Sequence, residues 1–192
     1  MQFLQRIPLL LFDPEIATAD LYDSPRLGEA FLMVSTYAGL TSLNSLLSGY
    51  LKTQTFSVGL IAFLGSFLLI FLTWVFLATI FHISAELLGG LGEFPNALGF
   101  VGLAAAPHIL TSLISIVLTI LSAAVFVDDP DKLLLKIGLG VTLVGMAWGW
   151  PGILCYFGFK NAERVHSLKA LIVTMLVFFG FAALEVLSSD AF

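Results

Sequence analysis

A histidine and a glutamate stand four residues apart near the end of a long apolar stretch of the sequence. His82 and Glu86 therefore share one face of a helix, a spacing that can bind a metal ion or pass a proton. His108 directly follows Pro107 in the next apolar stretch, and a helical bundle could bring it near this pair. Because ionisable groups at membrane depth are costly unless paired or hydrated, we interpret His82, Glu86 and His108 as a candidate polar site.

The pair also has a structural interpretation, which we favour over a chemical one. His82 and Glu86 lie at a predicted helix end beside a glycine turn, where a mutual hydrogen bond or hydration at the membrane interface would satisfy both. The sequence contains no phosphate-binding glycine motif ahead of a lysine, no HExxH pair and no GxSxG turn. The glycines of GGLGEF are therefore interpreted as a tight turn between helices. We expect no enzymatic activity, no cofactor and no metal site.

The elements that must position these residues are membrane-spanning helices. Of the 192 residues, 59% are hydrophobic and 11% are charged, with a mean hydropathy of +1.03. Soluble proteins have roughly 25% charged residues. A bilayer core needs about 20 mostly apolar residues per helix, and stretches of that length recur here. We predict an all-α fold, an integral membrane bundle of about five transmembrane helices.

The charge balance and the cysteine content exclude other classes of function. The chain has 13 acidic and 8 basic residues, a formal net charge of -5. A polybasic surface for nucleic acid is therefore absent, and we expect membrane lipids rather than nucleic acid as surroundings. Cys155 is the single cysteine, so neither an internal disulfide nor a cysteine metal cluster can form. We expect Cys155 to pack inside the bundle.

Residues 1–27 are predicted to form a segment outside the transmembrane bundle of residues 28–192. Its apolar residues recur at the spacing of one helix face, which is typical of a short helix in the membrane interface: Phe3, Leu4, Ile7, Leu10 and Leu11. An irregular tail with a few buried leucines explains the pattern equally well. The apolar run 7–12 is too short for a signal peptide and contains Pro8, so we expect the segment to be retained.

Two of the predicted spans contain a proline. The spans cover residues 30–51, 55 to the glycines at 89, 96–127, 133–159 and 167–187. The third is longer than one crossing needs and contains Pro107, and the fourth contains Pro151. Because proline removes a backbone donor and crowds the preceding turn, we predict a kink or a break near each.

Small residues mark faces on which helices can approach closely. One stripe on the first span is made of Ala38, Ser42, Ser45 and Gly49, and the fourth span has a GxxxG pair, Gly145 and Gly149. Small residues let helix backbones come together and hydrogen-bond across an interface. We therefore place the polar first span inside the bundle and interpret both sets as helix-packing residues.

Basic residues near the helix ends predict the orientation of the chain in the membrane. Five lie on the side of the N-terminus: Arg6, Arg26, Lys160, Arg164 and Lys169. Three lie on the other side: Lys52, Lys132 and Lys136. Since basic residues favour the cytoplasmic side, we predict a cytoplasmic N-terminus and an external or luminal C-terminus.

Three segments carry a family resemblance. The first, HISAELLGGLGEFPNALGFVGLAAAPHIL, has a polar helix end, a glycine turn followed by an aromatic residue, and a helix with a mid-span proline, matched by Gly89, Gly90, Gly92, Phe94 and Pro107. The others are AERVHSLKALIV before the last span and the opening LLLFDPEIATADLYDSPRLGEAF. Together they resemble the Yip family, the Ypt- and Rab-interacting membrane proteins and their prokaryotic relatives.

The resemblance implies a five-helix Yip-domain protein. Eukaryotic relatives act with small GTPases in vesicle traffic and membrane shaping, usually as hetero-oligomers. This sequence has almost no hydrophilic N-terminal domain, which argues against recruitment of a small GTPase and fits a short prokaryotic-type member.

Two functions follow as hypotheses. The first is a non-enzymatic scaffold or partner-binding component in membrane organisation or trafficking, which forms homo- or hetero-oligomers through its small-residue faces. The alternative is a small transporter or lipid-handling protein with a polar site near His82, Glu86 and His108, because broken helices often line substrate sites.

Overall fold

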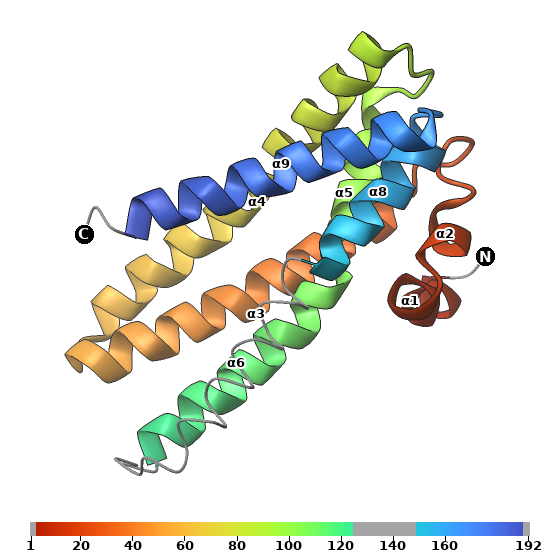
Figure 1. The fold of residues 1–192 in the computed structure, drawn as a ribbon. Coiled ribbons are helices and arrows are strands. Elements are labelled where there is room, and N and C mark those ends of the chain that lie inside the picture. Colours follow the sequence, from red (N-terminus) through yellow and green to blue (C-terminus); the bar gives the residue numbers. More distant parts are fainter. Residues whose placement is uncertain (1–2, 125–148, 190–192) are drawn as a thin grey trace, which may run out of the picture.

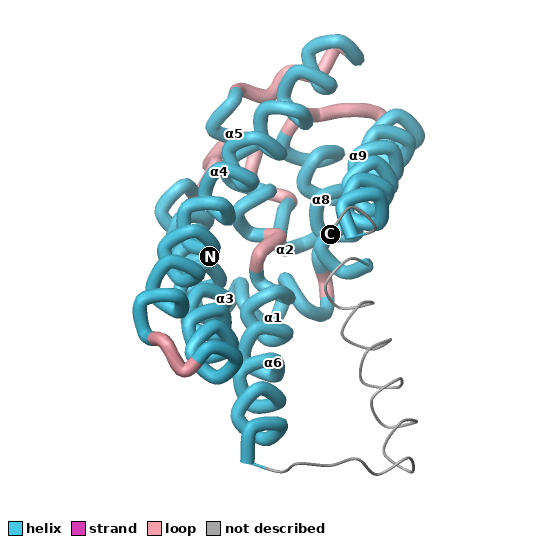
Figure 2. The backbone as a smooth tube through the Cα atoms, turned by 90° about the vertical axis from the view of Figure 1, so that its left-hand side faces the viewer, coloured by secondary structure: helices cyan, strands magenta, loops and turns pink. Residues whose placement is uncertain are grey.

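The computed structural model describes residues 3–124 and 149–189, and the statements below concern these residues. Within them the chain consists of helices joined by short loops, and no strand is formed (Figure 2). The long helices α3, α4, α6 and α9 give the molecule an elongated shape (Figure 1). The expected all-helical fold is confirmed for this part of the chain.

Two short helices open the chain. Helix α1 spans Phe3–Phe12 and helix α2 spans Pro14–Thr18. Asp13 separates them, and its carboxylate accepts a hydrogen bond of 3.3 Å from the backbone N–H of Ile16, as an N-cap residue does. The N-terminal segment is therefore helical, and the irregular-tail alternative is wrong.

Helices α3 and α4 form the longest hairpin of the fold. Helix α3 spans Leu27–Thr53 and helix α4 spans Phe56–Leu88. The two run side by side from a tight connection that Gln54 makes possible by adopting a left-handed conformation, with φ at 55° (Figure 1). Gly49 and Gly59 meet at this contact, where a Cβ atom built on Gly49 would lie 3.1 Å from Cα of Gly59. Only small residues permit such close backbones.

The predicted third span is two helices. Helix α5 spans Phe94–Leu103 and helix α6 spans Ala106–Ala124. The break falls just ahead of Pro107, which has no N–H to offer the carbonyl of Leu103 one helical turn earlier. The prediction of a kink or a broken helix near Pro107 is therefore confirmed.

Helices α8 and α9 form the last part of the chain. Helix α8 spans Trp150–Ala162, with Pro151 in its first turn, where a proline fits without loss of a hydrogen bond. It continues past the predicted end at residue 159. Helix α9 spans Ser167–Ser189 and begins at the predicted residue. The earlier part of the predicted fourth span, with Gly145, lies outside the described residues.

Three described helical stretches are long and apolar enough to cross a membrane: Leu27–Thr53, Phe56–Leu88 and Phe94–Ile120. In α9, the shorter stretch Ser167–Gly180 is also apolar. The structure thus supports an integral membrane protein that crosses the bilayer more than once. The count of five crossings and the division at residues 27 and 28 stay predictions.

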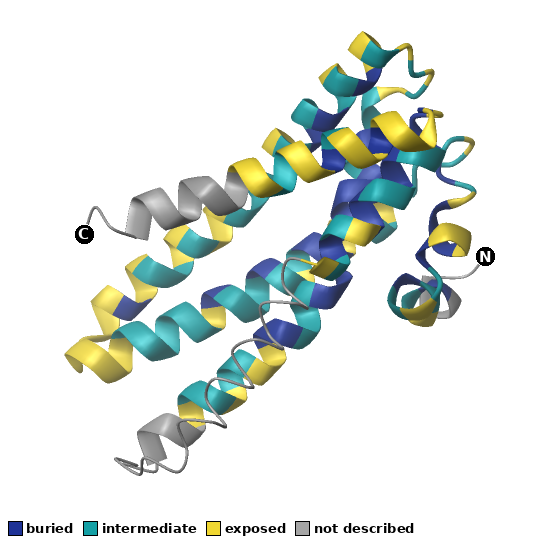
Figure 3. Cartoon of the chain, in the orientation of Figure 1, coloured by how far each residue is buried: buried dark blue, intermediate teal, exposed yellow. Residues whose placement is uncertain are grey.

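The buried residues gather toward one end of the bundle. Figure 3 shows α5 largely buried and α8 partly buried, whereas α4 and the coloured part of α9 are mostly half-buried or exposed. The centre of this core is an aromatic cluster from three helices, with Phe81 of α4 lying 5.3 Å from Phe100 of α5 and 5.2 Å from Phe159 of α8 between ring centroids. All three rings are almost completely buried. The long apolar surfaces elsewhere suit contact with lipid rather than water.

Candidate functional site at the polar end

One end of the molecule collects most of the ordered polar contacts. Helices α1 and α2, the turn between α4 and α5, and the loop between α8 and α9 all lie there (Figure 1). We call this region the polar end. Asn96 of α5 connects three segments of this end, because its buried side-chain amide donates hydrogen bonds of 3.1 Å to the carbonyls of Tyr22 and Ala162.

The predicted pair is present at the polar end, and a third residue joins it. Nε2 of His82 lies 3.5 Å from Oε1 of Glu86, one turn along α4. Nδ1 of His82 lies 3.8 Å from Oε1 of Glu163, which follows the last residue of α8. His82 therefore stands between two carboxylates from different elements. Glu163 lies between the predicted spans 133–159 and 167–187, and its contact with His82 was not predicted from the sequence.

Glu163 is a buried carboxylate without a hydrogen-bond donor. Its side chain is 0% exposed, and within the described residues neither carboxylate oxygen accepts a hydrogen bond. Nδ1 of His82 is likewise buried and makes no hydrogen bond there. Burial, and then the negative charge of Glu86, raise the pKa of Glu163 to about 7. This carboxyl group can consequently hold or release a proton near neutral pH.

The glycine turn after α4 fits closely against Glu163. Gly89 ends the helix with φ at 78°, a conformation that side chains disfavour, and Gly90 N–H donates to the carbonyl of Ala85 at 2.8 Å. Leu91 N–H then donates to the backbone carbonyl of Glu163 at 2.9 Å. A Cβ atom on Gly92 would overlap the Glu163 carboxylate, so this position has no room for a side chain.

His108 lies in another environment. Its ring stacks on Tyr37 of α3, with 4.9 Å between the centroids. It lines a cavity of about 510 Å³ among the apolar helices, which His82 and Glu86 do not line. In the described residues no contact joins His108 to the other two. The structure does not bring His108 to His82 and Glu86, because α5 lies in the chain between the end of α4 and the start of α6.

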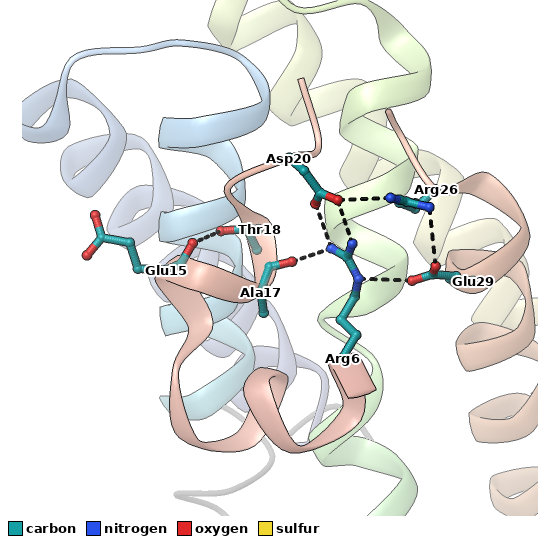
Figure 4. Close-up of polar contacts among 7 residues, drawn as sticks. All are labelled: Arg6, Glu15, Ala17, Thr18, Asp20, Arg26 and Glu29. Atoms are coloured by element: carbon teal, nitrogen blue, oxygen red, sulfur yellow. Dashed lines mark hydrogen bonds and ion pairs between the residues drawn. The ribbon is translucent and has the colours of Figure 1, made fainter. Parts of the chain in front are cut away.

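A second polar cluster, missed by the sequence analysis, surrounds Arg6. Figure 4 shows its guanidinium between two acidic side chains: it makes two hydrogen bonds of 2.8 and 2.9 Å to Asp20, and its Nε lies 3.1 Å from Glu29. Arg6 also donates to the carbonyl of Ala17, and Arg26 donates to Asp20 at 3.0 Å. Arg6 is 1% exposed. In the sequence, the cluster could have been found from Arg6 alone, because it is a charged residue within an otherwise apolar helix face.

The Arg6 cluster fastens the N-terminal helices to the start of α3. Partial burial alone would raise the pKa of Asp20, but the hydrogen bonds from Arg6 and Arg26 outweigh it and hold the pKa below its usual value. Asp20 therefore stays ionised and paired at neutral pH. On the other side of α2, Lys160 of α8 bonds to Glu15 at 2.7 Å, an exposed contact that raises the pKa of Lys160.

The small-residue stripe on α3 packs within the chain. Ala38 and Ser42 are fully buried. Ser45 accepts a hydrogen bond of 2.9 Å from Ser66 of α4, and Gly49 meets Gly59 as described above. Gly149 has no neighbouring atom close to where a Cβ would lie, and its predicted partner Gly145 is outside the described residues. The buried part of the stripe on α3 thus packs against other helices of the same chain.

The family model for the Yip1 domain matches residues 9–187. The chain belongs to the Yip1-domain family. Membership of this family suggests a role in membrane traffic, and it confirms the resemblance read from the sequence. No curated protein and no solved structure matches the chain.

Within this Yip1-domain protein the motif residues occupy two places. Gly89, Gly90 and Gly92 form the turn against Glu163, and Phe94 begins α5 with its ring 5.7 Å from the ring of His82. Pro107 lies beyond the turn, in the first residues of α6, where it accompanies the helix break. The motif therefore shapes the polar end and the route of the chain into the next helix.

Proposed function

We propose that this protein is a non-enzymatic, partner-binding component in membrane organisation or trafficking, and that it binds its partner at the polar end. The observation that carries the proposal is an exposed apolar patch on the glycine turn. Leu87 is 82% exposed and Leu91 is 64% exposed, and the two leucines flank the glycines that end α4. We call these two leucines the turn patch.

The surroundings of the turn patch favour a protein over a lipid surface as its partner. Glu86 is 67% exposed and Glu93 is also exposed, so carboxylates stand on both sides of the leucines. Apolar side chains rimmed by polar ones are common at protein interfaces. We therefore expect a membrane protein as partner, including a second copy of this chain, rather than a small GTPase.

The turn patch is also held rigidly before any partner arrives. The hydrogen bond from Leu91 N–H to the Glu163 carbonyl fixes the turn to the end of α8. The side-chain amide of Asn96 bonds the start of α5 to the carbonyl of Tyr22 ahead of α3 and to the carbonyl of Ala162 at the end of α8. A surface that is already ordered loses less entropy on binding, which favours partner recognition.

The polar end also predicts the orientation of the chain in the membrane. We propose that the polar end faces the cytoplasm, because it carries five of the eight basic residues. Cysteine substitutions at Asp23 and Thr53, both exposed and at opposite ends, would report this in intact cells. A membrane-impermeant thiol reagent is expected to label Thr53→Cys and not Asp23→Cys. Labelling of Asp23→Cys alone would reverse the orientation.

Site-specific photo-crosslinking tests the partner surface. A benzophenone amino acid replaces Leu91 in one variant and Leu51, exposed at the other end, in a matched control. In native membranes we expect a discrete cross-linked species from position 91 only, identified by mass spectrometry as this chain or another membrane protein. The substitution Glu93→Lys should reduce the yield of the cross-linked species from position 91. Equal yields from both positions, or cross-links to lipid alone, would refute the proposal.

A further inference from the structure

The cavity beside His108 is a second candidate site, separate from the polar end. It has a volume of about 510 Å³ and lies among helices α3, α4, α5, α6, α8 and α9. This volume is within the range of small-molecule sites, which is about 300–1,000 Å³. Most of its lining belongs to the helical stretches that are long and apolar enough to cross a membrane.

The lining of the cavity combines apolar walls with uncharged polar groups. Among the described residues that line it, none is an aspartate, glutamate, lysine or arginine. Polar side chains come from three helices: Tyr37, Thr41 and Asn44 of α3, Thr73 of α4, and His108, Thr111, Ser112 and Ser115 of α6. Leu69, Leu77 and Val177 provide apolar surface between them. A charged headgroup would find no counter-ion among these described side chains, whereas a neutral hydroxyl or ester group would find hydrogen-bond partners.

Several of these polar groups are not used by the fold. Thr41 and Ser112 bond to each other at 2.8 Å, and Asn44 Oδ1 accepts from Thr119 at 2.8 Å. By contrast, the hydroxyls of Thr73 and Ser115 make no hydrogen bond with the part of the chain that the structure describes, and the ring of His108 only stacks on Tyr37. In an apolar environment such groups gain free energy when a ligand supplies the missing partner.

The break between helices α5 and α6 also lies at this cavity. Ala104 and Ala105, the two residues between α5 and α6, both line the cavity. Irregular backbone at membrane depth is tolerated where it is buried in protein or lines a cavity, because a ligand or water can satisfy freed backbone groups there. The position of the break and the free side-chain groups are two independent features of one cavity.

We propose that this cavity binds a neutral, hydroxyl-bearing glycerolipid of the diacylglycerol class. The glycerol headgroup occupies the space between Thr73, His108 and Ser115, and the acyl chains extend along the apolar walls into the bilayer. The proposal concerns a different part of the molecule from the turn patch, and either can hold without the other.

A photoactivatable dioleoylglycerol with a diazirine in one acyl chain tests this directly. The probe is added to the full-length protein in mild detergent micelles, and labelled peptides are mapped by mass spectrometry. We expect labels on α3, α4 and α6 near the cavity. Unlabelled dioleoylglycerol should compete with the probe, and dioleoylphosphatidylglycerol, which is anionic, should compete poorly.

Matched substitutions on α4 distinguish a loss of lipid binding from a general loss of structure. Thr73→Phe fills the cavity, whereas Thr79→Phe places the same side chain on α4 at a residue that does not line it. Thr73→Phe is expected to lower labelling about tenfold, which corresponds to about 1.4 kcal/mol of binding free energy, and Thr79→Phe should leave it unchanged. His108→Leu keeps the volume but removes the ring nitrogens, so it should also lower labelling.

Each alternative outcome decides the question. If Thr73→Phe does not give a folded protein by gel filtration, Ser115→Phe fills the cavity from α6 and replaces it. Equal labelling in the wild type and both filling variants would overturn the proposal. Competition by the anionic lipid as strong as by dioleoylglycerol would overturn the assignment to a neutral headgroup.

Discussion

His82 and Glu163 approach each other across the polar end, with 3.8 Å between Nδ1 and Oε1, although 81 positions separate them in the sequence. The contact joins the end of α4 to the end of α8 and lies directly behind the glycine turn. The only other carboxylate close to His82 in the described chain is that of Glu86 on the same helix. A buried carboxyl group therefore lies where the ends of two helices meet.

The first prediction concerns the pH dependence of unfolding. The pKa of Glu163 is raised from 4.5 to about 7 by burial and by Glu86, so the folded state binds the proton more tightly than the unfolded state does. Its contribution to stability is complete below pH 4.5, declines as the pH rises, and is lost above about 7. Thermal unfolding in detergent should show a lower midpoint at pH 8 than at pH 5.

Glu163→Gln provides the control for this pH effect. Glutamine keeps the shape but cannot ionise, so the midpoint difference between wild type and variant should be near zero at pH 5 and should favour the variant at pH 8. His82, Glu86 and Lys169 lie in the same region of both proteins, which is why the difference between the two midpoints is the relevant quantity. A difference that does not change with pH would contradict the assignment.

The second prediction concerns Arg6. Arg6→Met keeps much of the buried stem but leaves Asp20 and Glu29 without their shared cation. We expect a loss of about 2–4 kcal/mol in the free energy of unfolding, below that for a fully buried pair because Asp20 is partly exposed. Lys160→Met removes an exposed pair with Glu15 and should cost less than about 1 kcal/mol. Titration with SDS in mixed micelles measures both, and equal losses would argue against a special role for Arg6.

The third prediction concerns the contact between α3 and α4. A Cβ atom on Gly59 would lie 2.7 Å from the carbonyl oxygen of Leu46, so Gly59→Ala must push the two helices apart. We expect a loss of about 1–3 kcal/mol, typical of overpacking. Gly65→Ala on the same helix meets no atom within 4 Å, and it should be neutral or slightly stabilising because alanine favours helix. The same unfolding titration compares them, and a neutral Gly59→Ala would contradict the close approach.

The fourth prediction concerns Asn96. Asn96→Leu has a similar size but removes the hydrogen bonds to the carbonyls of Tyr22 and Ala162, both of which then lose a donor. We expect a cost of about 1–3 kcal/mol. Limited proteolysis should also cut the segment around Tyr22 faster, since that bond helps to fasten it to α5. Unchanged cleavage would show that other contacts hold this segment.

The sequence by itself determined the membrane-spanning helical class, the break near Pro107 and the family. These follow from local properties: hydropathy over about 20 residues reports a span, and proline disrupts a helix wherever it stands. The glycine turn was likewise visible as GGLGEF. His82 and Glu86 were paired correctly because positions four apart on one helix are neighbours.

Only the tertiary structure decided which distant residues meet. Glu163 looked like a loop residue, and Arg6 like one basic residue in an apolar segment, because burial depends on neighbours that come from other helices. His108 was expected beside His82, but α5 lies between the two and directs His108 to Tyr37. Composition and periodicity carry no information about such packing, since contacts between helices depend on how their side chains fit together in space.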